Sequence, residues 1–248
     1  MSKLLLKNLL LVLFVFLYSS FGIYYITQDF SDTIIVFILL WAFIYYLIES
    51  KVKDLGFVDI NLSVKGVAEL IANQEKDRLD IEKKGFSLID TYMTNSAATI
   101  TCYAYLSKDE DLIFFNLRLN KYHIFEFGSK FEKEIFLTTS NTVTISVRRP
   151  EKLIQIFPNA DDNNLLEAHR ESFKYLLSCG LKPLKIEKEN LRQRIIDGIA
   201  LDKKYQKKIP LYNIAMLFYS PFRYKKIVGK TIEEQDKQDI INIKTLKI

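Results

Sequence analysis

Hydrophobic and polar positions follow three different patterns along this chain, and the first predicts a membrane anchor. Residues 9–26 form an uncharged, largely apolar run, and residues 33–48 form a second, shorter one. A helix needs ~20 such residues to cross the hydrocarbon core of a bilayer. We therefore expect residues 1–50 to form a transmembrane helical hairpin.

Charged residues around the two runs predict their orientation. The loop at residues 27–32 contains two aspartates and neither lysine nor arginine, whereas lysines stand at positions 3, 7, 51 and 53. Since positive charge is enriched on the cytoplasmic side, both termini should be cytoplasmic in a multi-pass protein of the cell membrane. A cleaved signal peptide ending near Ser19–Ser20 is the alternative, and it leaves the rest of the chain on the same side.

The second pattern is helical and follows the anchor. Val64, Val67, Ala68 and Ile71 recur at the spacing of one helix face, and Gly85 is a stop signal. The segment 59–63 offers Asp, Asn and Ser as N-cap residues. Residues 51–85 should therefore form a connecting helix that leads to a cytoplasmic domain over 86–248.

The third pattern, from Phe86 to Arg148, alternates with a period of two. Ile113, Phe115 and Leu117, for example, share one face of a strand. Similar runs cover 86–92, 98–106, 111–119, 122–127, 134–139 and 142–147, with turn residues between them. This predicts an antiparallel β-meander of about six strands, and apolar residues on both faces of 112–117 indicate that helices cover part of the outer face. The fold class is α+β.

Helical patterns return after Pro158. Asp161 or Asp162 should cap a helix that ends at Gly180, and a second, charged helix is expected over about 187–208. Residues 209–226 form an amphipathic segment that is too short to span a bilayer. It is expected either to lie in the bilayer interface or to pack on the domain's own sheet.

Two stretches of this region carry a family resemblance. The strand "FLTTSN", a connector with proline, and then "LLEAHRESFKYLLSCGLKP" resemble a pattern in uncharacterised bacterial membrane-tethered proteins. Those proteins have two N-terminal transmembrane helices and a cytoplasmic α+β domain, so the resemblance implies an architecture and no activity. The arrangement is also similar to two-span β-barrel effectors of bacterial anti-phage signalling, from which the long additional helices depart.

Motifs for catalysis or metal binding are weak. The chain has two histidines and two cysteines, and His169 and Cys179 would lie about 15 Å apart on one helix, too far to share a metal. "VGKT" at 228–231 has Tyr224 where a phosphate loop needs glycine. We expect no cofactor and no metal. Asp109–Asp111 should form a solvated turn, and Cys102 should lie in the core.

His169 is the candidate for a general base. Glu167, Arg170 and Glu171 stand beside it, but the sequence places no nucleophile or acid near it. The alternative is a histidine on a helix face that packs against the sheet and hydrogen-bonds a polar neighbour. We expect this structural role.

A basic cluster near the C-terminus suggests a lipid surface. The net charge of +5 is too modest to indicate nucleic acid, but seven cations lie within the segment 209–226 or just before it. In a protein held at a membrane, anionic lipid head groups are the nearest partner, and a solvated charged face is the alternative. The expected lipid contacts are Lys203, Lys204, Lys207, Lys208, Arg223, Lys225 and Lys226.

These observations favour a non-enzymatic function. We expect a membrane-anchored cytoplasmic binding, sensing or scaffolding module, with a protein partner or a second copy of the chain as further partners. The alternative is a membrane-acting effector whose cytoplasmic domain senses a ligand and reorganises the transmembrane helices.

Overall fold

The computed structural model describes residues 56–64, 66–95, 100–109, 111–119, 122–142, 149, 151–189, 191–206, 208 and 223–247. The chain divides into two compact units, and apart from Arg223 these residues belong to the larger one, Gly56–Lys208 with Tyr224–Ile248. The expected transmembrane hairpin and residues 209–222 lie outside the described ranges. Within those ranges, no helix has the length and apolar character that a membrane crossing requires.

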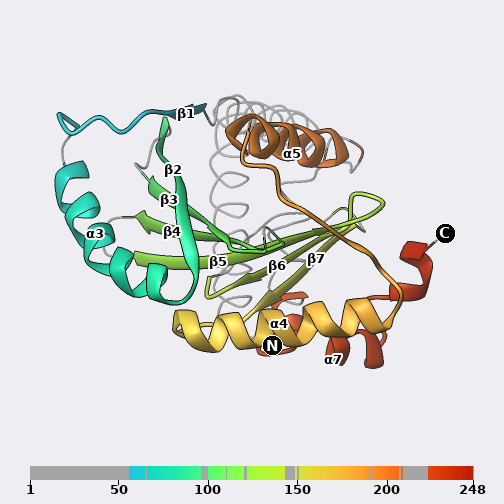
Figure 1. Cartoon of the computed structure of the whole chain (residues 1–248). Helices are drawn as coiled ribbons and strands as arrows, with labels where there is room; N and C mark the ends of the chain where they lie inside the picture. The colour runs from blue at the N-terminus through green and yellow to red at the C-terminus, as the bar shows by residue number, and fades with distance from the viewer. Residues whose placement is uncertain are drawn as a thin grey trace, which may run out of the picture. The chain divides into compact units, whose positions relative to one another are not determined.

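The centre of the larger unit is a β-sheet in which strands adjacent in sequence are also adjacent in space (Figure 1). The order is β1-β2-β3-β4-β5-β6-β7, and the short β8 pairs with the end of β5. Pairing is antiparallel from β1 to β6, while β7 runs parallel to β6. The strands are β1 Gly56–Val58, β2 Phe86–Asn95, β3 Ile100–Ser107, β4 Ile113–Leu119, β5 Tyr122–Phe131, β6 Phe136–Ser140, β7 Lys152–Ile156 and β8 Pro183–Leu184.

The predicted α+β class and the meander are confirmed from β2 to β6, and the sequence missed three strands. Most of the expected run 142–147 lies outside the described residues. The strand that extends the sheet beyond β6 is β7, in a segment expected to be a connector. Because β7 is parallel to β6, the chain must cross over between them instead of turning in a hairpin. β1 and β8 have only three and two residues, too few to show a period.

Helices cover both faces of the sheet. α3 (Val67–Lys83) and α4 (Asp162–Ser178) pack on one face, where Ile81 and Leu165 meet the aromatic residues of β3–β5. α5 (Leu191–Gln206) covers the opposite face through Leu191 and Ile195 (Figure 1). α7 (Ile232–Lys237) and the 3₁₀ helix η1 (Ile243–Lys247) pack with α4, through Ile232 and Ile243. The expectation that helices cover part of the outer face is thus confirmed.

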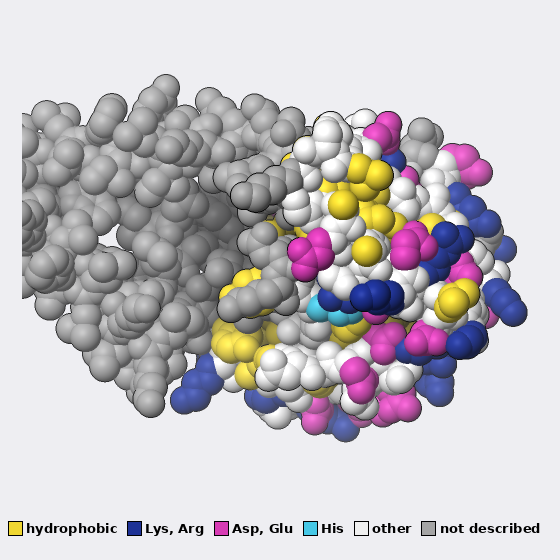
Figure 2. Space-filling model, turned by 90° about the vertical axis from the view of Figure 1, so that its left-hand side faces the viewer, with side chains coloured by type: hydrophobic (Ala, Val, Ile, Leu, Met, Phe, Trp, Pro, Cys, Tyr) yellow, Lys and Arg dark blue, Asp and Glu magenta, His cyan; other side chains and the backbone are white. Residues whose placement is uncertain are grey.

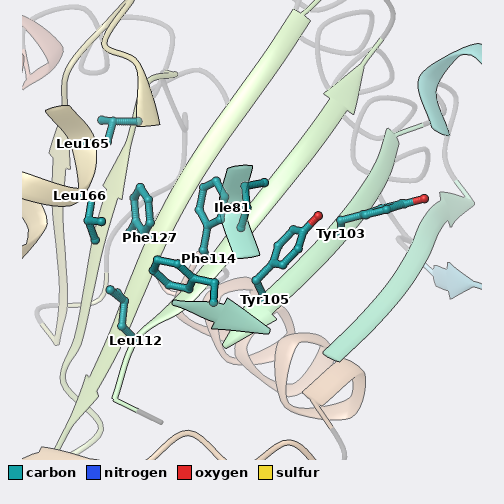
Figure 3. Packing of buried hydrophobic residues seen from close by; sticks show 9 residues of the cluster. Ile81, Tyr103, Tyr105, Leu112, Phe114, Phe127, Leu165 and Leu166 are labelled. Atoms are coloured by element: carbon teal, nitrogen blue, oxygen red, sulfur yellow. The ribbon is translucent and has the colours of Figure 1, made fainter. Parts of the chain in front are cut away.

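Strand alternation sorts the core into two layers. Tyr105, Phe114 and Phe127 point toward α3 and α4 (Figure 3), and the rings of Phe114 and Phe127 stack with centroids 4.4 Å apart. Cys102 and Ile113, which have the opposite parity, pack under α5. The period of two therefore decides which helix each strand residue meets.

The helix ends follow local chemistry, with one difference from the prediction. α3 begins after Gly66, whose φ is 85°, and the Asn61 side chain instead accepts a hydrogen bond from the Ser63 amide, 3.0 Å away. α3 lies in the same unit as the sheet and packs on it. The predicted stop at Gly85 and the predicted cap at Asp161, which accepts from the Asn164 amide at 2.8 Å, are confirmed.

Candidate ligand-binding site

A cavity of about 470 Å³ lies between α5 and the sheet. Its sheet side is built by alternate residues of β4, namely Ile113, Phe115 and Leu117, which share one face. Its helix side is built by residues three and four positions apart on α5, including Leu191, Ile195 and Ile199. The cavity is therefore mainly apolar.

Charged contacts fasten α5 at its N-terminal end. Arg192 donates to both carboxylate oxygens of Asp90 at 2.7 and 2.8 Å, and to Asp59 and the Thr91 carbonyl at 2.6 and 2.9 Å. Its guanidinium also lies 5.6 Å from the centre of the Tyr92 ring. An arginine in the first turn is unfavourable for the helix dipole. Arg192 thus serves the docking of α5 onto the sheet and not the stability of the isolated helix.

A second charged contact fastens the other end of α5. Asp202, which is 7% exposed, accepts from Arg149 Nε and from Lys152 Nζ, each at 2.8 Å. Each carboxylate oxygen thus serves one cation. The two fastenings hold α5 over the sheet while the middle of the helix stands over the cavity.

Gly198, in the interior of α5, lines this cavity. A Cβ atom placed on it would meet no heavy atom within 4 Å. Since glycine in a helix interior is about 1 kcal/mol less favourable than alanine, its presence lowers the stability of α5. The missing side chain leaves space in the cavity.

Glu126 of β5 is an ionisable side chain of the cavity wall that has no partner among the described residues. It lies opposite Phe115 of β4 and Ser140 of β6, on the face covered by α5. Burial raises the pKa of its carboxyl, and the positive charge of Lys152 acts in the opposite direction. No hydrogen bond or ion pair reaches this carboxyl from the described residues, although it remains partly accessible from the cavity.

The other charged side chains that line the cavity have partners. Lys130 donates to Glu134 at 3.1 Å, Asp197 accepts from Gln193 at 2.9 Å, and Arg194 pairs with Glu187. Arg149 and Lys152 are held by Asp202, as described above. Among the charged lining residues in the described ranges, Glu126 alone lacks a hydrogen-bond or ion-pair partner.

Two further polar groups distinguish the ends of the cavity. Thr138 of β6 is 3% exposed, and its hydroxyl has no hydrogen-bond partner among the described residues. At the β3 side, burial raises the pKa of the Cys102 thiol to about 12, so this cysteine is a neutral core residue, as predicted. The cavity therefore offers two unsatisfied polar groups on adjacent strands.

His169 lies on the opposite face of the sheet from this cavity. It is 1% exposed, its Nε2 is 3.0 Å from Ser129 Oγ, and its Nδ1 is 2.8 Å from Thr139 Oγ1. Ser129 Oγ donates to the Asp111 carbonyl, which leaves it an acceptor and assigns the ring proton to Nε2. Burial, with a smaller effect of Arg170, lowers the pKa of His169 to about 3.

The geometry of His169 matches the structural role we expected. Thr139 Oγ1 also accepts from Gln155 Nε2 at 2.6 Å, so the ring is one member of a buried network. Both ring nitrogens are occupied by hydroxyl groups of the fold. That His169 takes no part in catalysis stays a prediction.

The charged side chains of a polar cluster under α3 are paired with one another. Asp77 accepts from Arg118 at 2.7 Å and from Asn116 at 3.1 Å, and His123 Nε2 lies 3.3 Å from the same carboxylate. Figure 2 shows the side of the molecule that carries α3, where basic and acidic side chains are interspersed. This cluster adds a polar contact between α3 and the sheet, and the opposite charges of Asp77 and Arg118 are paired within it.

The expected lipid-contact residues fall on two separate stretches of the chain. Lys204 and Lys208, at and beyond the end of α5, are exposed, and so are Lys225 and Lys226 in the helical residues 223–227. Arg223 is half-buried, Lys203 lies in α5, and Lys207 lies outside the described residues. Contact with lipid stays a prediction for all seven.

The remaining sequence motifs serve the fold. Thr231 of "VGKT" caps α7, in a capping box with Glu234, and Gly229 has φ 70°. Asp111 accepts from the Ser107 hydroxyl at 2.9 Å in the turn between β3 and β4. In the part of the chain that the structure describes, no cluster of His, Cys, Asp and Glu could hold a metal ion.

Comparison with known proteins supplies no assignment. No protein-family model matches the chain, no curated protein matches it, and no solved structure is similar to it.

Proposed function

We propose that the larger unit is a binding module that holds a compact, mostly apolar small molecule between α5 and the sheet. The cavity of about 470 Å³ carries this proposal, since small-molecule sites commonly measure about 300–1,000 Å³ and combine apolar walls with a few polar groups. Gly198 leaves space in the cavity at a cost in helix stability, and two sets of ion pairs hold α5 above it.

Hydropathy and charge support a membrane location for this module. On this proposal, residues 1–50 hold it at the cytoplasmic side of the cell membrane. α5 ends at Gln206, and the amphipathic segment 209–226 follows almost directly along the chain. This continuity favours an effector as the second candidate, in which a ligand bound beneath α5 alters a segment close to the bilayer.

The topology part is tested with reporters that are active only in the cytoplasm. Fused after Ile248, such a reporter should be active, because the lysines flanking the apolar runs stay inside. Inserted at Phe30, it should be silent. The reverse pattern would overturn the orientation and the compartment together.

The binding part is tested by photolabelling of the full chain in lipid nanodiscs. The probe is a medium-chain alkyl alcohol that carries a diazirine, and labelled peptides are identified by mass spectrometry. We expect saturable labelling of peptides from β4 and α5. Gly198→Phe should reduce that labelling at least about tenfold, because its ring fills the open space of the cavity.

Ala200→Phe is the matched control. Ala200 lies on the exposed side of the same helix, so the added ring stays in solvent and labelling should be unchanged. Gly198→Phe removes a helix-interior glycine, so α5 should remain folded in hydrogen exchange. Equal labelling of wild type and Gly198→Phe, or labelling that never saturates, would sink the proposal.

A further inference from the structure

The unpaired groups of the cavity lie close together. Glu126 of β5 is two residues from Gly128, and Gly128 stands directly opposite Thr138 of β6. Residues in this diagonal relation have Cα atoms about 7–8 Å apart on one face of the sheet. The Glu126 carboxyl and the Thr138 hydroxyl therefore belong to one corner of the cavity.

Gly128 lies between them, and the side chains of Phe136 and Ile113 cover it. A Cβ atom there would lie 2.9 Å from a ring carbon of Phe136 and 3.2 Å from Ile113. The close packing admits no side chain at this position.

The chemistry of this corner selects a particular ligand group. We infer, on the basis of the binding function proposed above, that the ligand carries a protonated amine on its apolar body, and that this amine binds Glu126 and Thr138. A carboxylate and a hydroxyl are both acceptors for an ammonium group. The ring of Phe115, opposite Glu126 and also in the cavity wall, adds an aromatic surface that attracts cations.

The basic side chains of the cavity are less suited to binding an anionic ligand than Glu126 is to binding an amine, because they already have partners. Arg149 and Lys152 each have a carboxylate oxygen of Asp202 at 2.8 Å, and a ligand anion would have to compete with it. Lys130 and Arg194 are paired as well. At Glu126 an amine displaces no ion pair, because the nearby Lys152 is already held by Asp202, 2.8 Å away. The amine also removes the cost of leaving a buried carboxyl unsatisfied.

The test compares three photoprobes with the same alkyl diazirine body. One ends in a primary amine, one in an alcohol and one in a carboxylate, and each is titrated against the full chain in nanodiscs of zwitterionic lipid. Glu126→Gln should raise the half-saturating concentration of the amine probe at least about tenfold, since charge-assisted hydrogen bonds are the stronger ones. It should change that of the alcohol probe by less than about threefold.

Two further variants complete the design. Thr138→Val, which removes only the hydroxyl, should weaken amine labelling by a few-fold. Glu167→Gln replaces an exposed carboxylate on α4, on the other side of the sheet, and should change nothing. Ratios between variants cancel the different partitioning of the probes into the bilayer.

The outcomes separate the two proposals. If all three probes label the cavity alike and Glu126→Gln has no effect, the amine inference fails while the binding function stands. A preference for the carboxylate probe also overturns the amine inference, and it indicates that Arg149 and Lys152 recognise the ligand. If no probe gives saturable labelling of β4 and α5, the binding function itself fails.

Discussion

Replacing Gln155 by leucine should lower the free energy of unfolding of the larger unit by about 3 kcal/mol. Gln155 is fully buried on β7, and its amide donates to Thr139 Oγ1 at 2.6 Å and to the Ala168 carbonyl at 3.0 Å. Its carbonyl accepts from Ser172 Oγ at 2.7 Å and from the Ile232 amide at 3.2 Å. Leucine has a similar size, but it removes all of these hydrogen bonds, and the Ile232 amide keeps only Ser172 Oγ as an acceptor, 3.1 Å away.

The unfolding can be followed through Cys102. This thiol is 0% exposed in the folded chain, so its alkylation in increasing urea, quantified by mass spectrometry, reports opening of the sheet. Gln193→Leu, at an exposed position of α5, is the control and should stay within about 0.5 kcal/mol of wild type. Hydrogen exchange in 231–247 should also rise, because Gln155 holds the first residue of α7. A Gln155→Leu protein as stable as the control would show that the network contributes nothing.

Acidification should destabilise the larger unit through its two histidines. Burial lowers the pKa of His169 to about 3, and burial together with Arg118 lowers that of His123 to about 4, although Asp77 pulls it upward. In the unfolded chain both titrate near 6.5. Below that pH the unfolded state binds protons that the folded state does not, so stability falls as pH decreases.

The expected slope is about 1.4 kcal/mol per pH unit for each histidine between about pH 6 and pH 4.5. Glu126 acts against this histidine effect. Because its pKa is raised in the folded state, protonation of its carboxyl stabilises the folded state as the pH falls through that pKa. Urea unfolding followed by the near-ultraviolet circular dichroism of the tyrosines measures the slope. His169→Gln should remove about half of the histidine effect, and so should His123→Gln. A stability that is level from pH 7 to pH 5 contradicts the assignment.

Alternation along the strands was enough to predict most of the fold. The parity of Phe114 against Ile113 separates the two core layers, and Asp161 and Gly180 bound α4 close to the predicted positions. β7 was missed because its five residues follow the crossover, where the sequence shows only a short apolar run. Parallel pairing depends on residues distant in sequence, and no local pattern encodes it.

The cavity could not be predicted in the same way. Glu126 shares its strand with Phe125 and Phe127, so the alternation suggests a solvent position for it. Only the docking of α5, fixed by Arg192 and Asp202, turns that outer face into an enclosed one. The sequence signal closest to the site was Gly198, a glycine within an otherwise helical, charged segment.

The position of Ile232 and Ile243 in the core also determines when this domain can finish folding during synthesis. Both are at most 1% exposed, in one cluster with Phe131 and Leu137 from the middle of the chain. Until they leave the ribosome, the apolar residues of β6 and β7 that they cover remain open to other chains. Productive folding of the sheet therefore waits for the last-made part of the domain, and translation pausing beyond α5 should make this protein dependent on chaperones.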